Sequence, residues 1–161
     1  MSENENAPYA TSTVTNTAET PGMAQTPFSL DTVKKIRTIH LERAKAEGEK
    51  FSMLTCYDFS TAQVFDRAGI EMLLIGDSAA NVMLGYDSTL AITLDEIIPM
   101  VAAVSRGAKR AMVVADLPFG TYEQSPQQAV ASAARLMKEG GAHAVKIEAD
   151  ARMADWLQAL V

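Results

Sequence analysis

The stretch Met72-Leu73-Leu74-Ile75-Gly76-Asp77-Ser78 decides the fold that this sequence predicts. Four large apolar residues follow one another without a polar break and then give way to Gly-Asp-Ser. A continuous apolar run of this kind is typical of a strand buried on both faces, as in a parallel sheet. The acid that follows is costly to bury unless it is paired or bound to a cation. Asp77 is therefore expected to lie at a charged or metal-binding edge of the sheet.

The same pattern occurs twice more along the chain. The apolar run 112–115 ends in Asp116, and the run 144–147, which includes one lysine, ends in Glu148. If the three strands are parallel neighbours, their carboxyl ends meet at one edge of the sheet and bring the three acids together. Three converging carboxylates outline a site for a hard cation. The opposing interpretation is that each acid only caps a loop, which is the commoner role for a single strand-end aspartate.

Strands and helices are expected to alternate along the chain. The segment 51–58 is predicted as a first strand, and 79–92 as a long loop. Thr38, Ser60, Thr93 and Ser125 are candidate N-caps, the last two within capping boxes, and a final helix is expected at about 151–160.

Four strands alternating with helices predict a parallel sheet with right-handed crossovers. An open doubly wound sheet and part of a (β/α)₈ barrel both fit this alternation. No Gly-x-Gly-x-x-Gly or Walker motif is present, which argues against nucleotide-binding folds. Acids at several strand ends favour the barrel, whose chemistry lies at that edge, although a full barrel needs roughly 250 residues. Residues 28–161 are thus predicted to form about half of a TIM barrel with a short N-terminal helix, preceded by a polar, disordered tail at 1–27.

Composition and charge narrow the function further. Hydrophobic residues make up 48% of the 161 residues and charged residues 21%, as in ordinary soluble globular proteins. The net charge of −6 argues against broad nucleic-acid binding, and no apolar stretch is long enough to cross a membrane. One cysteine fits a reducing compartment, so a cytoplasmic location is expected. The first basic residue, Lys34, comes too late for a signal or transit peptide.

Five short motifs, in this order and spacing, resemble the ketopantoate hydroxymethyltransferase family of pantothenate biosynthesis. The resemblance runs from about Arg37 to Glu148, and no single motif would be specific alone. The motifs are Met53-Leu54-Thr55-Cys56-Tyr57-Asp58, Gly76-Asp77-Ser78, Gly85-Tyr86-Asp87-Ser88-Thr89-Leu90, Ala115-Asp116-Leu117-Pro118-Phe119 and Val145-Lys146-Ile147-Glu148.

The resemblance implies a TIM-barrel transferase that uses Mg²⁺ and forms homo-oligomers. Such an enzyme transfers a one-carbon unit from methylenetetrahydrofolate to α-ketoisovalerate, giving ketopantoate. By motif, Asp77, Asp116 and Glu148 are expected at the metal, and Asp77, Ser78, Asp116 and Lys146 at the keto acid. Tyr57 and Asp58 are interpreted as structural or folate-side residues.

The resemblance also has departures. Family members usually have glycines where this chain has Ala149 and Asp150. The family's general base, a glutamate on a later strand, has no counterpart and is expected beyond the C-terminus. Two other hypotheses therefore stand beside the transferase. One is a non-catalytic fragment or barrel-completing module, and the other is a related Mg²⁺-dependent carbon–carbon lyase.

Overall fold

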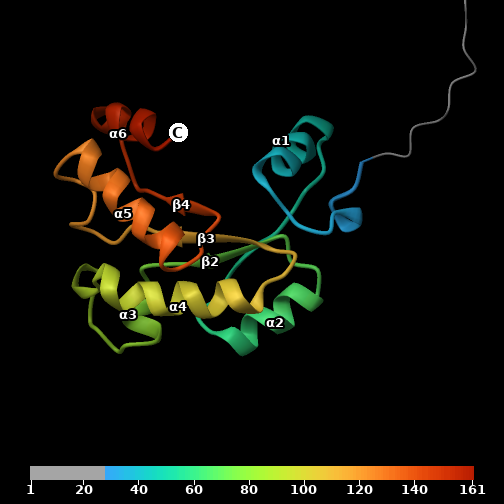
Figure 1. Cartoon of the computed structure of the whole chain (residues 1–161), viewed down its shortest axis with the longest axis horizontal. Helices are drawn as coiled ribbons and strands as arrows, with labels where there is room; N and C mark the ends of the chain where they lie inside the picture. The colour runs from blue at the N-terminus through green and yellow to red at the C-terminus, as the bar shows by residue number, and fades with distance from the viewer. Residues whose placement is uncertain (1–27) are drawn as a thin grey trace, which may run out of the picture.

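The computed structural model describes residues 28–161, so the predicted tail at 1–27 lies outside the described residues. Strands and helices alternate along the chain as expected (Figure 1). The strands are β1 (Met53–Thr55), β2 (Met72–Ile75), β3 (Met112–Asp116) and β4 (Ala144–Lys146). The helices are η1 (Leu30–Thr32), α1 (Thr38–Glu47), α2 (Phe59–Arg67), α3 (Ala79–Val82), η2 (Thr89–Ala91), α4 (Leu94–Gly107), α5 (Pro126–Lys138), η3 (Ala151–Met153) and α6 (Ala154–Leu160). None of the helices in this part of the chain is long and apolar enough to cross a membrane.

The four strands form one parallel sheet whose spatial order, β1-β2-β3-β4, is also their order in the sequence. A doubly wound sheet reverses direction at a switch point, whereas a barrel adds each strand beside the previous one. The prediction of a partial (β/α) barrel is therefore confirmed, and so is the neighbourhood of the three strands that end in acids. Within the described residues β1 and β4 are the edges of the sheet.

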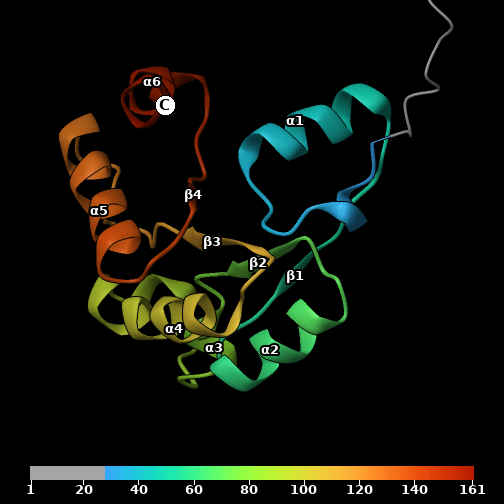
Figure 2. The ribbon, with the colours of Figure 1, turned by 45° about the vertical axis from the view of Figure 1, so that its right-hand side comes forward.

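Successive side chains of a strand point to opposite faces of the sheet, and the two faces carry two separate apolar clusters. Leu73, Ile75 and Val113 belong to the cluster under α2, α4 and α5, where they are fully buried. Met112 and Val114 point the other way and pack with Leu30, Ile36 and Ala44 of the N-terminal segment and α1. Figure 2 shows α1 on one side of the sheet and α2, α3 and α4 on the other. Because side chains alternate with period two, Asp116 lies on the α1 side of β3.

One arginine fixes the N-terminal segment to the amino-terminal end of the sheet. The Arg110 guanidinium donates to the carbonyl oxygens of Leu30 (2.7 Å), Val33 (3.1 Å) and Gly69 (2.8 Å). Asp66 in turn accepts the backbone N–H groups of residues 109, 110 and 111. This network holds the segment before α1 at the edge opposite the three acids.

Several predicted boundaries were wrong. Thr38 is the first residue of α1, whose N-cap is Arg37, and α2 is capped by Asp58 instead of Ser60. Asp58 accepts the N–H of Thr61 at 2.9 Å, so this strand-end acid is a helix cap. The predicted loop 79–92 contains α3 and η2, and the last helix is divided into η3 and α6.

The two predicted capping boxes had different outcomes. At Thr93 the box is confirmed, because Thr93 and Glu96 exchange both hydrogen bonds. Ser125 caps α5 by accepting the N–H of Gln128, but the Gln128 side chain accepts from the backbone N–H of Gln124, so no reciprocal bond closes the box.

Both strands at the sheet edges are shorter than the predicted segments 51–58 and 144–148, because ladder pairing ends at residues 55 and 146.

Candidate active site

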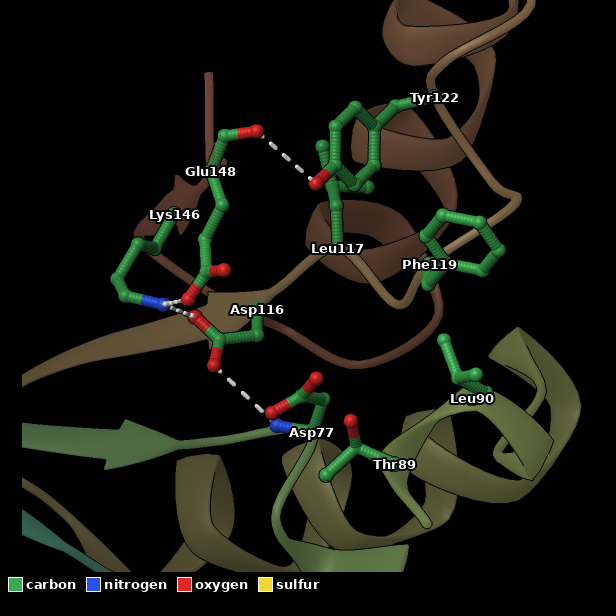
Figure 3. Close-up of a pocket in the computed structure, with 9 residues that line it drawn as sticks. All are labelled: Asp77, Thr89, Leu90, Asp116, Leu117, Phe119, Tyr122, Lys146 and Glu148. Atoms are coloured by element: carbon green, nitrogen blue, oxygen red, sulfur yellow. Dashed lines mark hydrogen bonds and ion pairs between the residues drawn. The ribbon is translucent and has the colours of Figure 1, made fainter. Parts of the chain in front are cut away.

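A pocket lies where β2, β3 and β4 end (Figure 3). It is lined by three acids, one lysine and five other side chains from the loops that follow the strands. These residues are Asp77, Thr89, Leu90, Asp116, Leu117, Phe119, Tyr122, Lys146 and Glu148. The carboxyl edge of the sheet therefore forms the pocket, as the sequence predicts.

Asp116 is the central acid of the pocket. Its side chain is buried, and one carboxylate oxygen accepts the backbone N–H of Asp77 at 3.2 Å. The other oxygen accepts from Lys146 Nζ at 2.7 Å. Asp116 and Lys146 are register partners on neighbouring strands, so sheet pairing alone places the two charges side by side.

Lys146 lies between two acids. Its ammonium group is 2.7 Å from the Asp116 carboxylate and 3.6 Å from that of Glu148. Burial lowers the pKa of Lys146, but the hydrogen bond and charge of Asp116, helped by Glu148, outweigh that effect and raise the pKa above its ordinary value. Lys146 is therefore a permanent cation at the pocket near neutral pH. The Glu148 side chain is 83% exposed, and its carboxylate faces Lys146 (Figure 3).

Ser78 lies beside the acids, at the start of α3. Its hydroxyl makes no cap hydrogen bond to α3 and instead lies 2.8 Å from the Tyr57 hydroxyl. Gly76 leaves room for this pair: a Cβ there would lie 2.9 Å from Ser78 Oγ and 3.4 Å from Asp116 Oδ2. Tyr57, interpreted from the sequence as a structural or folate-side residue, is thus in contact with the candidate site residue Ser78.

We expect Gly76→Ala to displace the Ser78 hydroxyl, because a 2.9 Å contact with a Cβ is too short to persist. In a catalytically complete enzyme that contains residues 35–161 of this chain, steady-state kinetics should show a loss of roughly tenfold or more in kcat/KM, with a melting temperature within a few degrees of the parent enzyme. Gly48→Ala, at the C-cap of α1 and outside the pocket, is the control: its φ of 72° makes alanine strained there, so it should lower the melting temperature without changing kcat/KM. An unchanged kcat/KM in Gly76→Ala would show that the Ser78 position does not matter.

The donor set of the pocket fits Mg²⁺ with substrate and water completing its coordination. Figure 3 shows the Asp77 and Asp116 carboxylates next to each other at the pocket floor. Within residues 28–161 no three acid, histidine or cysteine side chains gather closely enough to hold a metal by themselves. Mg²⁺ keeps several waters and needs only one or two protein carboxylates. The expected metal role of Glu148 stays a prediction, because its carboxylate faces the lysine.

Five pocket residues were not assigned as site residues from the sequence: Thr89, Leu90, Leu117, Phe119 and Tyr122. Four of them belong to the motifs Gly85–Leu90 and Ala115–Phe119, so a signal for them existed. Tyr122 follows those motifs and is one of the buried residues of the pocket wall. Burial raises its pKa, so its phenol stays protonated and can donate. Its place in the wall depends on how the loop after β3 folds back.

Comparison with known proteins found one matching family model and relatives that share one name. The family model described as ketopantoate hydroxymethyltransferase matches residues 35–161. A protein of Mycobacterium sp. strain KMS named 3-methyl-2-oxobutanoate hydroxymethyltransferase is 61% identical over 126 residues, which are 78% of this chain and 45% of that protein. A Mycobacterium tuberculosis protein of the same name is 57% identical over 137 residues, 85% of this chain and 49% of that protein. The chain thus spans about half the length of the curated relatives it matches.

A solved structure with a similar fold is 2,3-dimethylmalate lyase, described as a PEP mutase/isocitrate lyase superfamily member. The TM-score is 0.53 at 22% identity, over 75% of this chain and 47% of the other. At this identity the likeness concerns the fold alone, so the lyase hypothesis gains no support from it.

Proposed function

Because the chain belongs to the ketopantoate hydroxymethyltransferase family, we propose that it forms the metal- and keto-acid-binding part of a hydroxymethyltransferase. The reaction transfers a hydroxymethyl group from methylenetetrahydrofolate to α-ketoisovalerate and gives ketopantoate, in pantothenate biosynthesis. The observation that carries the proposal is the pocket at the ends of β2, β3 and β4, where two adjacent carboxylates lie beside a lysine cation. We also propose that the complete enzyme is a homo-oligomer, as the family resemblance implies, and that it works in the reducing environment of the cytoplasm.

In this proposal Asp77 and Asp116 would hold Mg²⁺, and the keto acid would bind beside it in the pocket. When bound, Mg²⁺ supplies Lewis acidity that draws charge from the keto group and acidifies the neighbouring C–H. Lys146 balances the substrate carboxylate or the developing enolate, a role suited to a group that stays charged. The Ser78 hydroxyl, oriented by Tyr57, donates to the substrate.

The proton must leave the carbon that forms the new bond, which requires a general base. We assign this role to none of residues 28–161. Two of the three pocket carboxylates, those of Asp116 and Glu148, face the lysine, and the third, that of Asp77, is assigned to the metal in this proposal. The base is placed in the part of the curated relatives that this chain does not span.

A chimaera tests the proposal directly. Residues 35–161 replace the matched segment of the 61%-identical Mycobacterium sp. relative, so that the relative supplies the remaining half. We expect the chimaera to convert α-ketoisovalerate and methylenetetrahydrofolate to ketopantoate in a Mg²⁺-dependent way, as measured by mass spectrometry. If the chimaera folds but forms no product, while the unaltered relative is active in the same assay, the hypothesis of a non-catalytic module is favoured.

A further inference from the structure

Tyr122 connects the loop after β3 to the end of β4. Its hydroxyl donates to the backbone carbonyl of Glu148 at 3.1 Å, and its ring forms one wall of the pocket (Figure 3). The residue is 6% exposed, so both the ring and the hydroxyl are held by packing. Ladder pairing between β3 and β4 ends at Lys146. The Tyr122 hydroxyl therefore holds the chain two residues past the last paired position.

The loop that carries Tyr122 is itself fixed from two helices. Trp156 of α6 donates its indole N–H to the Tyr122 carbonyl at 2.7 Å. Ser132 of α5 donates its hydroxyl to the neighbouring Thr121 carbonyl at 2.6 Å. Because both backbone carbonyls are held, the phenol is anchored on a rigid support, and the hydrogen bond to Glu148 transmits that rigidity to β4.

The chain segment that Tyr122 holds carries the pocket cation. Lys146 lies two residues before Glu148, and its own carbonyl accepts the N–H of Leu117 at 3.0 Å. Within the described residues, ladder pairing between β3 and β4 stops at Lys146. A segment beyond the last paired residue frays unless something else fixes it, and here a side chain from the pocket wall does so.

We propose that Tyr122 is a positioning residue that fixes the end of β4 and thereby keeps Lys146 against Asp116. The expected change in KM rests on the proposed function, since Lys146 is the group that would meet the substrate. The expected change in structure does not depend on the function. Loss of the phenol hydroxyl loosens the end of β4 but leaves the loop in place, because Trp156 and Ser132 still hold that loop.

The test uses Tyr122→Phe in the chimaera, which removes the hydroxyl and keeps the ring. We expect the exchange rate of the Leu117 amide to rise by roughly three- to tenfold in hydrogen-exchange NMR, the size expected for one lost hydrogen bond. The KM for α-ketoisovalerate should rise by a similar factor, with a smaller change in kcat. In a Lys146→Met background the same change should leave KM unaltered, because a residue that acts through Lys146 has no further effect once Lys146 is gone.

Tyr86→Phe is the matched control, because it also removes a phenol hydroxyl, one that donates to Glu96 of α4 and not to β4 or its supporting loop. It should leave Leu117 exchange near the parent value. Equal effects of Tyr86→Phe and Tyr122→Phe on Leu117 exchange would overturn the inference, as would unchanged Leu117 exchange in Tyr122→Phe. A chimaera without activity that still shows faster Leu117 exchange in Tyr122→Phe would count against the proposed function and leave the positioning of β4 supported.

Discussion

Asp116→Asn in the chimaera is expected to lower Mg²⁺-dependent turnover by about a hundredfold or more. Asparagine keeps the shape of the side chain and can still accept the Asp77 N–H, but it removes the charge that faces Lys146 and the proposed metal. Losing one electrostatic stabiliser from a preorganised site typically costs ten- to a thousandfold in rate. Initial rates measured over a range of Mg²⁺ concentrations should show both a lower maximum and a higher Mg²⁺ requirement.

Asp95→Asn makes the same chemical change far from the pocket. Asp95 is a largely exposed residue of α4 that pairs with Arg135 of α5, and exposed pairs contribute little to stability. Its rates should equal those of the parent. If Asp116→Asn retained near-normal activity with an unchanged Mg²⁺ requirement, the assignment of Asp116 to the metal site would be wrong.

The 161-residue chain on its own is expected to self-associate and to produce no ketopantoate. Within the described residues β1 and β4 each have one strand neighbour, so both present unpaired backbone groups. Phe51, just before β1, and Met53 and Leu54, within it, are between 38% and 45% exposed. Light scattering coupled to size exclusion should show species larger than a monomer at micromolar concentration.

Lysine on an edge strand discourages pairing between chains. Leu54→Lys should therefore shift the distribution toward the monomer, whereas Ile39→Lys, at an exposed position of α1 and not on a strand, should not. A monomeric parent chain that unfolds cooperatively and converts both substrates would contradict the expectation on both counts.

Features that follow from strand period and strand ends could be predicted from the sequence. The apolar runs before Asp77 and Asp116 predict two neighbouring strands with their acids at one edge of the sheet, and these runs are local patterns. The side of the sheet on which Asp116 lies and the pairing of Asp116 with Lys146 were not predicted, because packing against α1 and the register of β3 and β4 decide them.

Helix starts and loop residues were harder because tertiary contacts decide them. Asp58 was placed at the end of a strand, but its carboxylate caps α2, since pairing of β1 stops three residues earlier. Tyr122 gave no signal, because its contacts join residues 26 and 34 positions away. The exposure of Glu148 likewise depends on where the chain goes after β4.

The most direct test of the account is the binding of α-ketoisovalerate to the chimaera, measured by calorimetry with and without Mg²⁺. If Asp77 and Asp116 hold a metal that the keto acid chelates, binding should require Mg²⁺ and should be lost in both Asp77→Asn and Asp116→Asn. Lys146→Met should weaken binding but leave its Mg²⁺ dependence intact. Binding of the keto acid that is equally tight without Mg²⁺ and in both aspartate variants would contradict the account.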